Sequence, residues 1–195
     1  MIQLEVFAYL ETLPDGNHNR YGTILQSGGN TTIIGNVVLK NPGSASPVSE
    51  ENDSIFGRED GRLQFSPDAT MYALADLFML DKKTGTIRLY NLVDFRDTIP
   101  EQALRASTIS VDKVAEEILN GPPVPTYIGW GNLWQRKELI ARAKDIFQAA
   151  LPHSSYLNPE ISKNEFIHPL YLMRYGANEP RCKNLITEFR KNLDL

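Results

Sequence analysis

The chain has 195 residues, of which 42% are hydrophobic and 23% charged, and its formal net charge is −4 at pH 7. This is an ordinary globular composition, and the acidic balance argues against a protein that lives by non-specific binding to the nucleic-acid backbone, which usually shows a basic domain. The single cysteine, Cys182, excludes an intrachain disulfide and a cysteine-based metal cluster. The N-terminal stretch carries Glu5 and Glu11 and has no basic segment, and no apolar run approaches the roughly 20 residues that span a bilayer. We therefore expect one cytoplasmic domain without a membrane segment.

The first forty residues predict three short strands separated by turns. Apolar and polar residues alternate at the start of 2–9, as in a half-buried strand, and the Pro-Asp-Gly-Asn-His-Asn run at 14–19 predicts a turn. A second strand is predicted over 20–26, and Ser27-Gly28-Gly29-Asn30 predicts a hairpin turn. The third and most apolar strand spans 31–40.

The third strand must end at Asn41-Pro42-Gly43. Proline has no backbone N–H, and glycine permits a positive φ, so the chain turns here. The small residues that follow, Ser44-Ala45-Ser46, leave backbone N–H groups open to a ligand. The long polar stretch 44–67 is then either a functional loop or a surface insertion.

The rest of the chain alternates helices and strands. Asp68 is a plausible N-cap for a helix whose apolar face runs from Met71 to Leu80. After it we expect a strand over 86–90, a helix over 111–119, a strand over 125–130, a helix over 133–151, a short extended piece over 166–170 and a terminal helix over 182–193. This alternation predicts an α/β fold, with a parallel sheet and helices on both faces.

In an open parallel sheet, ligands bind outside the carboxyl ends of the strands. The polar residues that follow the predicted strands are Asn41, Asn91 with Asp94 and Arg96 just beyond it, Asn132, and His168. An amide presents a donor and an acceptor together and can read the edge of a base. A histidine can donate to a departing anion.

Each of these residues also has a plainer explanation. An Asn at a strand end is commonly a turn residue, His168 can be a structural hydrogen-bonding residue, and Asp68 can be only a cap. Arg96 can simply pair with Asp94 or Asp97. The three histidines show no metal-ligand spacing, and the chain contains neither a Walker-type phosphate loop nor a dinucleotide fingerprint. We expect no metal and no cofactor.

Several short segments form an ordered set along the chain: Arg20-Tyr21, Asn41-Pro42-Gly43-Ser44-Ala45, Asp68-x-Thr70, Asn91-Leu92-Val93-Asp94-Phe95-Arg96, Gly129-Trp130-Gly131 and His168-Pro169-Leu170-Tyr171-Leu172. Taken in order, they resemble a bacterial and phage family, domain-of-unknown-function family 1643, which has no settled activity. The resemblance covers roughly residues 20–175; Gly43 stands where the family commonly has Ser, and 48–66 look like an insertion.

The same layout is similar to the uracil-DNA glycosylase superfamily. The mismatch-specific branch has Asn-Pro-Gly, like Asn41-Pro42-Gly43, a later strand ends in an Asn like Asn91, and the last motif begins His-Pro, like His168-Pro169. The resemblance implies a three-layer α/β/α fold with a mainly parallel central sheet. It implies one domain over 1–195, with a core at about 20–175, the 44–67 loop and a helical tail at 176–195.

The same resemblance implies roles for the site residues. Asn41 would position a water against the sugar carbon, His168 would stabilise the departing base anion, and Asn91 would read the base. Backbone groups near Gly43 to Ala45 would hold the phosphate or sugar. The predicted binding set also includes Pro42, Ser44, Arg96 and Asn132, the last from its place at a strand end. The catalytic aspartate of the uracil-specific branch is absent, which leaves Asn41 in its place.

Two functions are compatible with this set of residues. The first is a nucleobase- or nucleotide-recognising hydrolase that cleaves an N-glycosidic bond, as a DNA glycosylase does. The second is a non-catalytic module that binds a nucleotide-like ligand or a protein on the same fold. The acidic charge and the absence of a recognisable minor-groove wedge favour the second; the ordered set Asn41, Asn91 and His168 favours the first.

Overall fold

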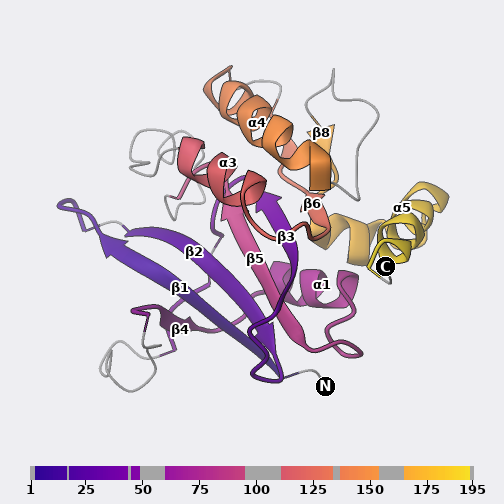
Figure 1. The fold of residues 1–195 in the computed structure, drawn as a ribbon, viewed down its shortest axis with the longest axis horizontal. Coiled ribbons are helices and arrows are strands. Elements are labelled where there is room, and N and C mark those ends of the chain that lie inside the picture. Colours follow the sequence, from indigo (N-terminus) through magenta and orange to yellow (C-terminus); the bar gives the residue numbers. More distant parts are fainter. Residues whose placement is uncertain are drawn as a thin grey trace.

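A computed structural model describes residues 3–16, 18–43, 45–48, 60–94, 111–133, 137–153 and 165–193 (Figure 1). In chain order the strands are β1 (Leu4–Thr12), β2 (His18–Ser27), β3 (Ile33–Leu39), β4 (Leu63–Phe65), β5 (Gly85–Asn91), β6 (Thr126–Ile128), β7 (Gly131–Asn132) and β8 (Glu165–Phe166). The helices are α1 (Ala69–Leu77), α3 (Val111–Leu119), α4 (Lys137–Ala150) and α5 (Pro180–Lys191), with a 3₁₀ turn η1 (Leu151–His153) and a π-helical turn η3 (Tyr171–Tyr175). The predicted strands and helices of these segments are therefore present, with shifts of a few residues at their ends, except that the extended piece expected over 166–170 is a strand only at Phe166 and turns helical at Pro169.

Six strands form one mixed sheet in the order β4-β1-β2-β5-β3-β6, and β7 and β8 form a separate pair. The fold class α/β is confirmed, but the prediction of a mainly parallel sheet is wrong. Three of the five pairings in the large sheet are antiparallel (β1–β2, β1–β4 and β2–β5) and only β3–β5 and β3–β6 are parallel. The chain therefore combines an antiparallel half with a parallel half, and β5 belongs to both.

The turn at Ser27-Gly28-Gly29-Asn30 does not join a hairpin. Both glycines have a φ of +66°, as expected of a tight turn, but β2 and β3 lie on opposite sides of β5. The reason lies later in the chain, because β5 offers a hydrogen-bonding edge to each of them, antiparallel to β2 and parallel to β3. The residues of the turn predicted the turn correctly, but they wrongly predicted that β2 and β3 pair with each other.

A short strand lies within the stretch predicted as the 44–67 loop. β4 pairs with β1, and Pro47 forms an isolated bridge to Phe65, so the described part of this stretch extends the sheet edge. Phe65 is buried in the same core as the β1 residues Val6 and Ala8.

The helices pack against the parallel half through close contacts with β3 and β5. Gly35 of β3 lies directly against the ring of Phe78, at the end of α1, where any Cβ would clash. A Cβ on Gly121, just after α3, would likewise clash, at 2.6 Å from the guanidinium of Arg88 on β5. Figure 1 shows α3 and α4 lying together near the carboxyl ends of β3 and β5. Helices and connecting loops therefore surround the carboxyl ends of β3 and β5 (Figure 1).

In the described part of the chain, no helix combines the length and apolar character that crossing a membrane requires. Among the same residues, no group of three or more His, Cys, Asp or Glu side chains is arranged to hold a metal ion.

Candidate functional site

Two small hollows lie where β3 and β5 end. The first, which we call the Asn41 hollow, has a volume of about 80 Å³ and is lined by Leu39, Asn41, Pro42, Gly43, Asp68, Thr70, Met71, Leu89 and His168. The second, the Asp94 hollow, has a volume of about 100 Å³ and is lined by Tyr9, Tyr21, Gly22, Arg62, Leu89, Tyr90, Asn91, Asp94, Lys113, Val114 and Glu117. Each has room for several water molecules or one small ring, and Leu89 contributes to both.

The turn that forms one wall of the Asn41 hollow is fixed by backbone hydrogen bonds to the chain after β5. The N–H groups of Leu92 and Val93 donate to the carbonyls of Leu39 and Lys40, at 2.9 and 3.1 Å. Gly43 then adopts a φ of +70°, which is strained for any residue with a Cβ. The position of Asn41 is thus set by the end of β3, as the sequence predicted.

A fully buried arginine, Arg20, contacts the chain directly after this turn. The Arg20 Nη1 donates to the carbonyl of Ala45 at 3.2 Å, and its guanidinium lies 5.4 Å from the centre of the Phe65 ring. Its backbone N–H donates to the carbonyl of Asp94 at 2.8 Å. Arg20 therefore ties the Asn41 turn to the segment that carries Asp94. A charged residue in an apolar strand was the available signal for this role.

His168 lines the Asn41 hollow and has one defined hydrogen-bond donor. The backbone N–H of Leu170 donates to its Nδ1 at 3.3 Å, so Nδ1 is an acceptor and the neutral ring carries its proton on Nε2. Burial lowers the pKa of His168, the positive charge of Lys40 lowers it further, and the carboxylate of Asp68 opposes both. At neutral pH the ring is therefore neutral, with an Nε2–H donor.

Asp68 lines the same hollow, which sequence reasoning did not anticipate. It is the N-cap of α1, as predicted: its Oδ1 accepts the backbone N–H of Met71 at 2.9 Å. Its Oδ2 faces the Asn41 turn, where a Cβ on Gly43 would lie 3.3 Å from it. The signal in the sequence was a capping residue that follows the turn loop, but a cap alone does not indicate a site.

The structure brings together four of the residues that the sequence singled out: Asn41, Pro42, Gly43 and His168. Asn91 is not among them, because it lines the Asp94 hollow. Ser44 and Arg96 lie outside the described residues, and so does the side chain of Asn132, whose backbone pairs with Glu165 between β7 and β8. The expected set is thus divided between two places on either side of Leu89.

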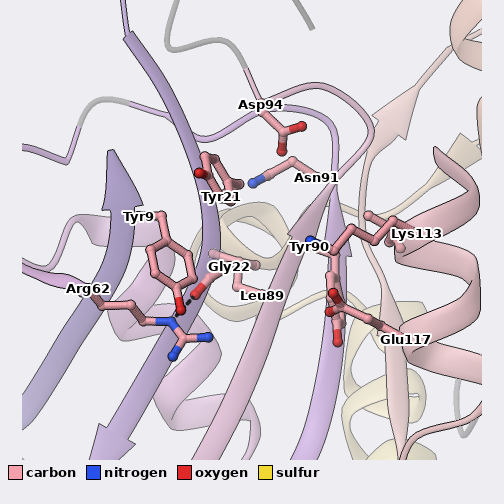
Figure 2. A pocket seen from close by; sticks show the side chains of 11 residues that line it. Tyr9, Tyr21, Gly22, Arg62, Leu89, Tyr90, Asn91, Asp94, Lys113 and Glu117 are labelled. Carbon is pink, nitrogen blue, oxygen red and sulfur yellow. Dashed lines mark hydrogen bonds between the residues drawn. The ribbon is translucent and has the colours of Figure 1, made fainter. Parts of the chain in front are cut away.

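The Asp94 hollow forms where β2 separates from β5 (Figure 2). The two strands pair as far as Thr23 and Leu89, after which Gly22 has a φ of +56° and its carbonyl turns to accept Arg62 Nε at 2.8 Å. A Cβ on Gly22 would lie 2.7 Å from the ring of Tyr9, so glycine is required there. In Figure 2, Asn91 and Asp94 approach Tyr21 on one side and Tyr90 lies beside Glu117 on the other.

Burial dominates the electrostatics of the Asp94 hollow. It raises the pKa of Asp94 to about 7; Arg142 lowers it and Glu11 adds to the increase. Burial also raises the pKa of Tyr90, with Glu117 adding to the shift against the opposing charge of Arg88. A carboxyl that titrates near neutral pH can donate as well as accept a hydrogen bond. The Asp94 hollow therefore suits a polar ring, while the Asn41 hollow combines a carboxylate, an amide and a neutral imidazole.

In comparisons with family models, curated proteins and solved structures, the chain matches none of them. The chemistry of the hollows is thus the basis for any statement about function.

Proposed function

We propose that the Asn41 hollow recognises a nucleobase and hydrolyses the N-glycosidic bond that joins it to its sugar. The proposal includes the three-layer, uracil-DNA glycosylase-like arrangement that the sequence resemblance implies. The observation that carries it is that one hollow is lined by both Asn41 and the half-buried His168, whose tautomer leaves an Nε2–H donor. A cytoplasmic location is part of the same proposal.

The chemistry requires a leaving group that departs as an anion. A neutral His168 can donate a hydrogen bond from Nε2–H to a carbonyl oxygen of the base, and this bond strengthens as negative charge develops there. The Asn41 amide can accept from a water and orient it toward the sugar carbon. The hollow, at about 80 Å³, is too small to enclose a whole nucleotide, so only part of the substrate would lie in it.

The net charge of −4 favours a free nucleoside or nucleotide over a long duplex. Duplex substrates require a flipped base, and flipping costs a few kcal/mol that phosphate contacts must supply. We therefore expect the highest activity on small substrates, with DNA carrying uracil or a mismatch as the alternative.

The test is a screen for base release from nucleosides, nucleotides and oligonucleotides that contain uracil or a mismatch. We expect release that is lost in Asn41→Ala and His168→Ala. Absence of release from every substrate, or full activity in both variants, would refute this function.

The alternative function is ligand binding without turnover, and the Asp94 hollow favours it. Asn91, the expected base reader, lies there with the buried carboxyl of Asp94 and the ring of Tyr21, apart from His168. A ligand at one hundred times its Kd would stabilise the protein by about 2.7 kcal/mol. Thermal unfolding with nucleobases and nucleosides, repeated on Asp94→Asn, would locate such binding; stabilisation that is unchanged in this variant would place the ligand elsewhere.

A further inference from the structure

The two oxygens of the Asp68 carboxylate have different surroundings. Oδ1 accepts the N–H of Met71 and is held at the N-terminus of α1. No N–H or O–H within the described ranges donates to Oδ2, which lies at the Gly43 side of the Asn41 hollow. One oxygen therefore fixes the side chain, and the other is available to a molecule in the hollow.

The Asp68 side chain interacts with two neighbours, the N-terminus of α1 and the ring of His168. A negatively charged side chain interacts favourably with the partial positive charge at the N-terminus of α1. The charge of the Asp68 carboxylate raises the pKa of His168, against the larger lowering effect of burial. Asp68 and His168 thus interact across the same small space that Asn41 borders.

Hydrolysis in this hollow needs a proton acceptor that Asn41 cannot provide. An amide oxygen orients a water but is not basic enough to take its proton, and the neutral His168 is committed as a donor through Nε2–H. Among the residues that line the hollow, Asp68 is the remaining group with a free basic oxygen.

We propose that Asp68 is a further catalytic residue, whose Oδ2 accepts the proton of the attacking water. The inference rests on the proposed N-glycosidic hydrolysis. The bond between the sugar carbon and the base nitrogen breaks, and the base leaves as an anion held by His168 Nε2–H. The water oxygen bonds to the sugar carbon and its proton passes to Asp68. The base then takes a proton from solvent, and Asp68 returns its own to solvent.

Asp68→Asn separates this role from the capping role. Asparagine is as good an N-cap as aspartate, so the bond to Met71 N–H can remain while the basic oxygen is lost. The matched control is Asp76→Asn, which removes the same charge from the same helix at an exposed ion pair with Arg190. We would measure base release under single-turnover conditions, together with thermal stability and the titration of His168 by NMR.

We expect Asp68→Asn to reduce the rate of base release by about 10²-fold or more, within the range for a general base, with thermal stability close to that of the original protein. The pKa of His168 should fall in the same variant. Asp76→Asn should change neither the rate of base release nor the pKa of His168. Base release within threefold of the original rate in Asp68→Asn would overturn the role of Asp68 and leave the proposed function standing. If the unmodified protein releases no base from any substrate, the proposed function and the role of Asp68 both fail.

Discussion

The Asn41 and Asp94 hollows share the side chain of Leu89 but are built in different ways. In the Asn41 hollow two polar groups are held by local contacts: Asp68 caps α1, and His168 accepts from the N–H two residues later. The end of β3, which carries Asn41, is held by hydrogen bonds from Leu92 and Val93. The Asp94 hollow exists because β2 bends away from β5 at Gly22. Its polar groups come from strands β1, β2 and β5, from helix α3, and from Arg62 and Asp94, which lie just before β4 and just after β5.

The difference decides which chemistry each hollow can support. Fixed orientation and a defined tautomer suit a reaction, because catalysis depends on groups held in place before the substrate arrives. A buried carboxyl whose protonation changes near neutral pH suits pH-dependent binding. The following experiments test this division.

The largest expected effect is on base release. His168→Ala removes the Nε2–H donor, and we expect a loss of about 10²- to 10³-fold, the range for one donor to a developing anion. Asn91→Ala, in the other hollow, should leave the rate within about threefold. Single-turnover assays on the same substrate compare the two directly. An equal loss in both variants would mean that Asn91 also acts on the substrate and that the hollows function as one.

The next effect is on the pH dependence of stability. The pKa of Asp94 is about 7 in the folded protein, against about 3.9 in an unfolded chain. Between these values the unfolded chain has lost a proton that the folded protein retains, so the free energy of unfolding falls as pH rises from about 4 to about 7. The slope is on the order of 1.4 kcal/mol for each pH unit.

Asp94→Asn should remove this contribution, because an amide does not titrate. Urea unfolding of the original protein and of Asp94→Asn at pH 5 and pH 8 would show it as a smaller difference between the two pH values in the variant. An identical pH dependence in the two proteins would contradict the burial of an ionisable Asp94.

A smaller effect concerns the cap of α1. Asp68→Ala removes the acceptor for Met71 N–H and should lower the free energy of unfolding by about 1 kcal/mol, while Asp68→Asn should lower it by only a few tenths. Urea unfolding of both variants gives the comparison. An equal loss of stability in the two would show that the charge of Asp68 matters more than its cap.

The smallest effect is on the titration of His168. The positive charge of Lys40 lowers the pKa of His168, so Lys40→Gln should raise it while leaving the fold intact. The shift can be followed from the ring C–H resonances as a function of pH. A fall in the pKa of His168 would contradict the arrangement of charges around the Asn41 hollow.

Local patterns in the sequence predicted the parts that depend on a few neighbouring residues. The end of β3 at Asn41-Pro42-Gly43, the Asp68 cap and the helix Val111–Leu119 all lie where they were expected. The sheet could not be predicted in the same way. Nothing near Ser27 indicates that β5, almost sixty residues later, inserts between β2 and β3.

The residues of the candidate site also fall into two groups, those placed by local sequence and those placed by tertiary structure. The sequence by itself determined that Asn41, Gly43 and His168 follow extended segments, because proline, glycine and the run of apolar residues act over a few positions. Only the tertiary structure decided that Asp68 joins them and that Asn91 lies in another hollow with Asp94. Those outcomes depend on which strand edges pair and on where β2 bends, and pairing between distant segments is set by the packing of the whole sheet.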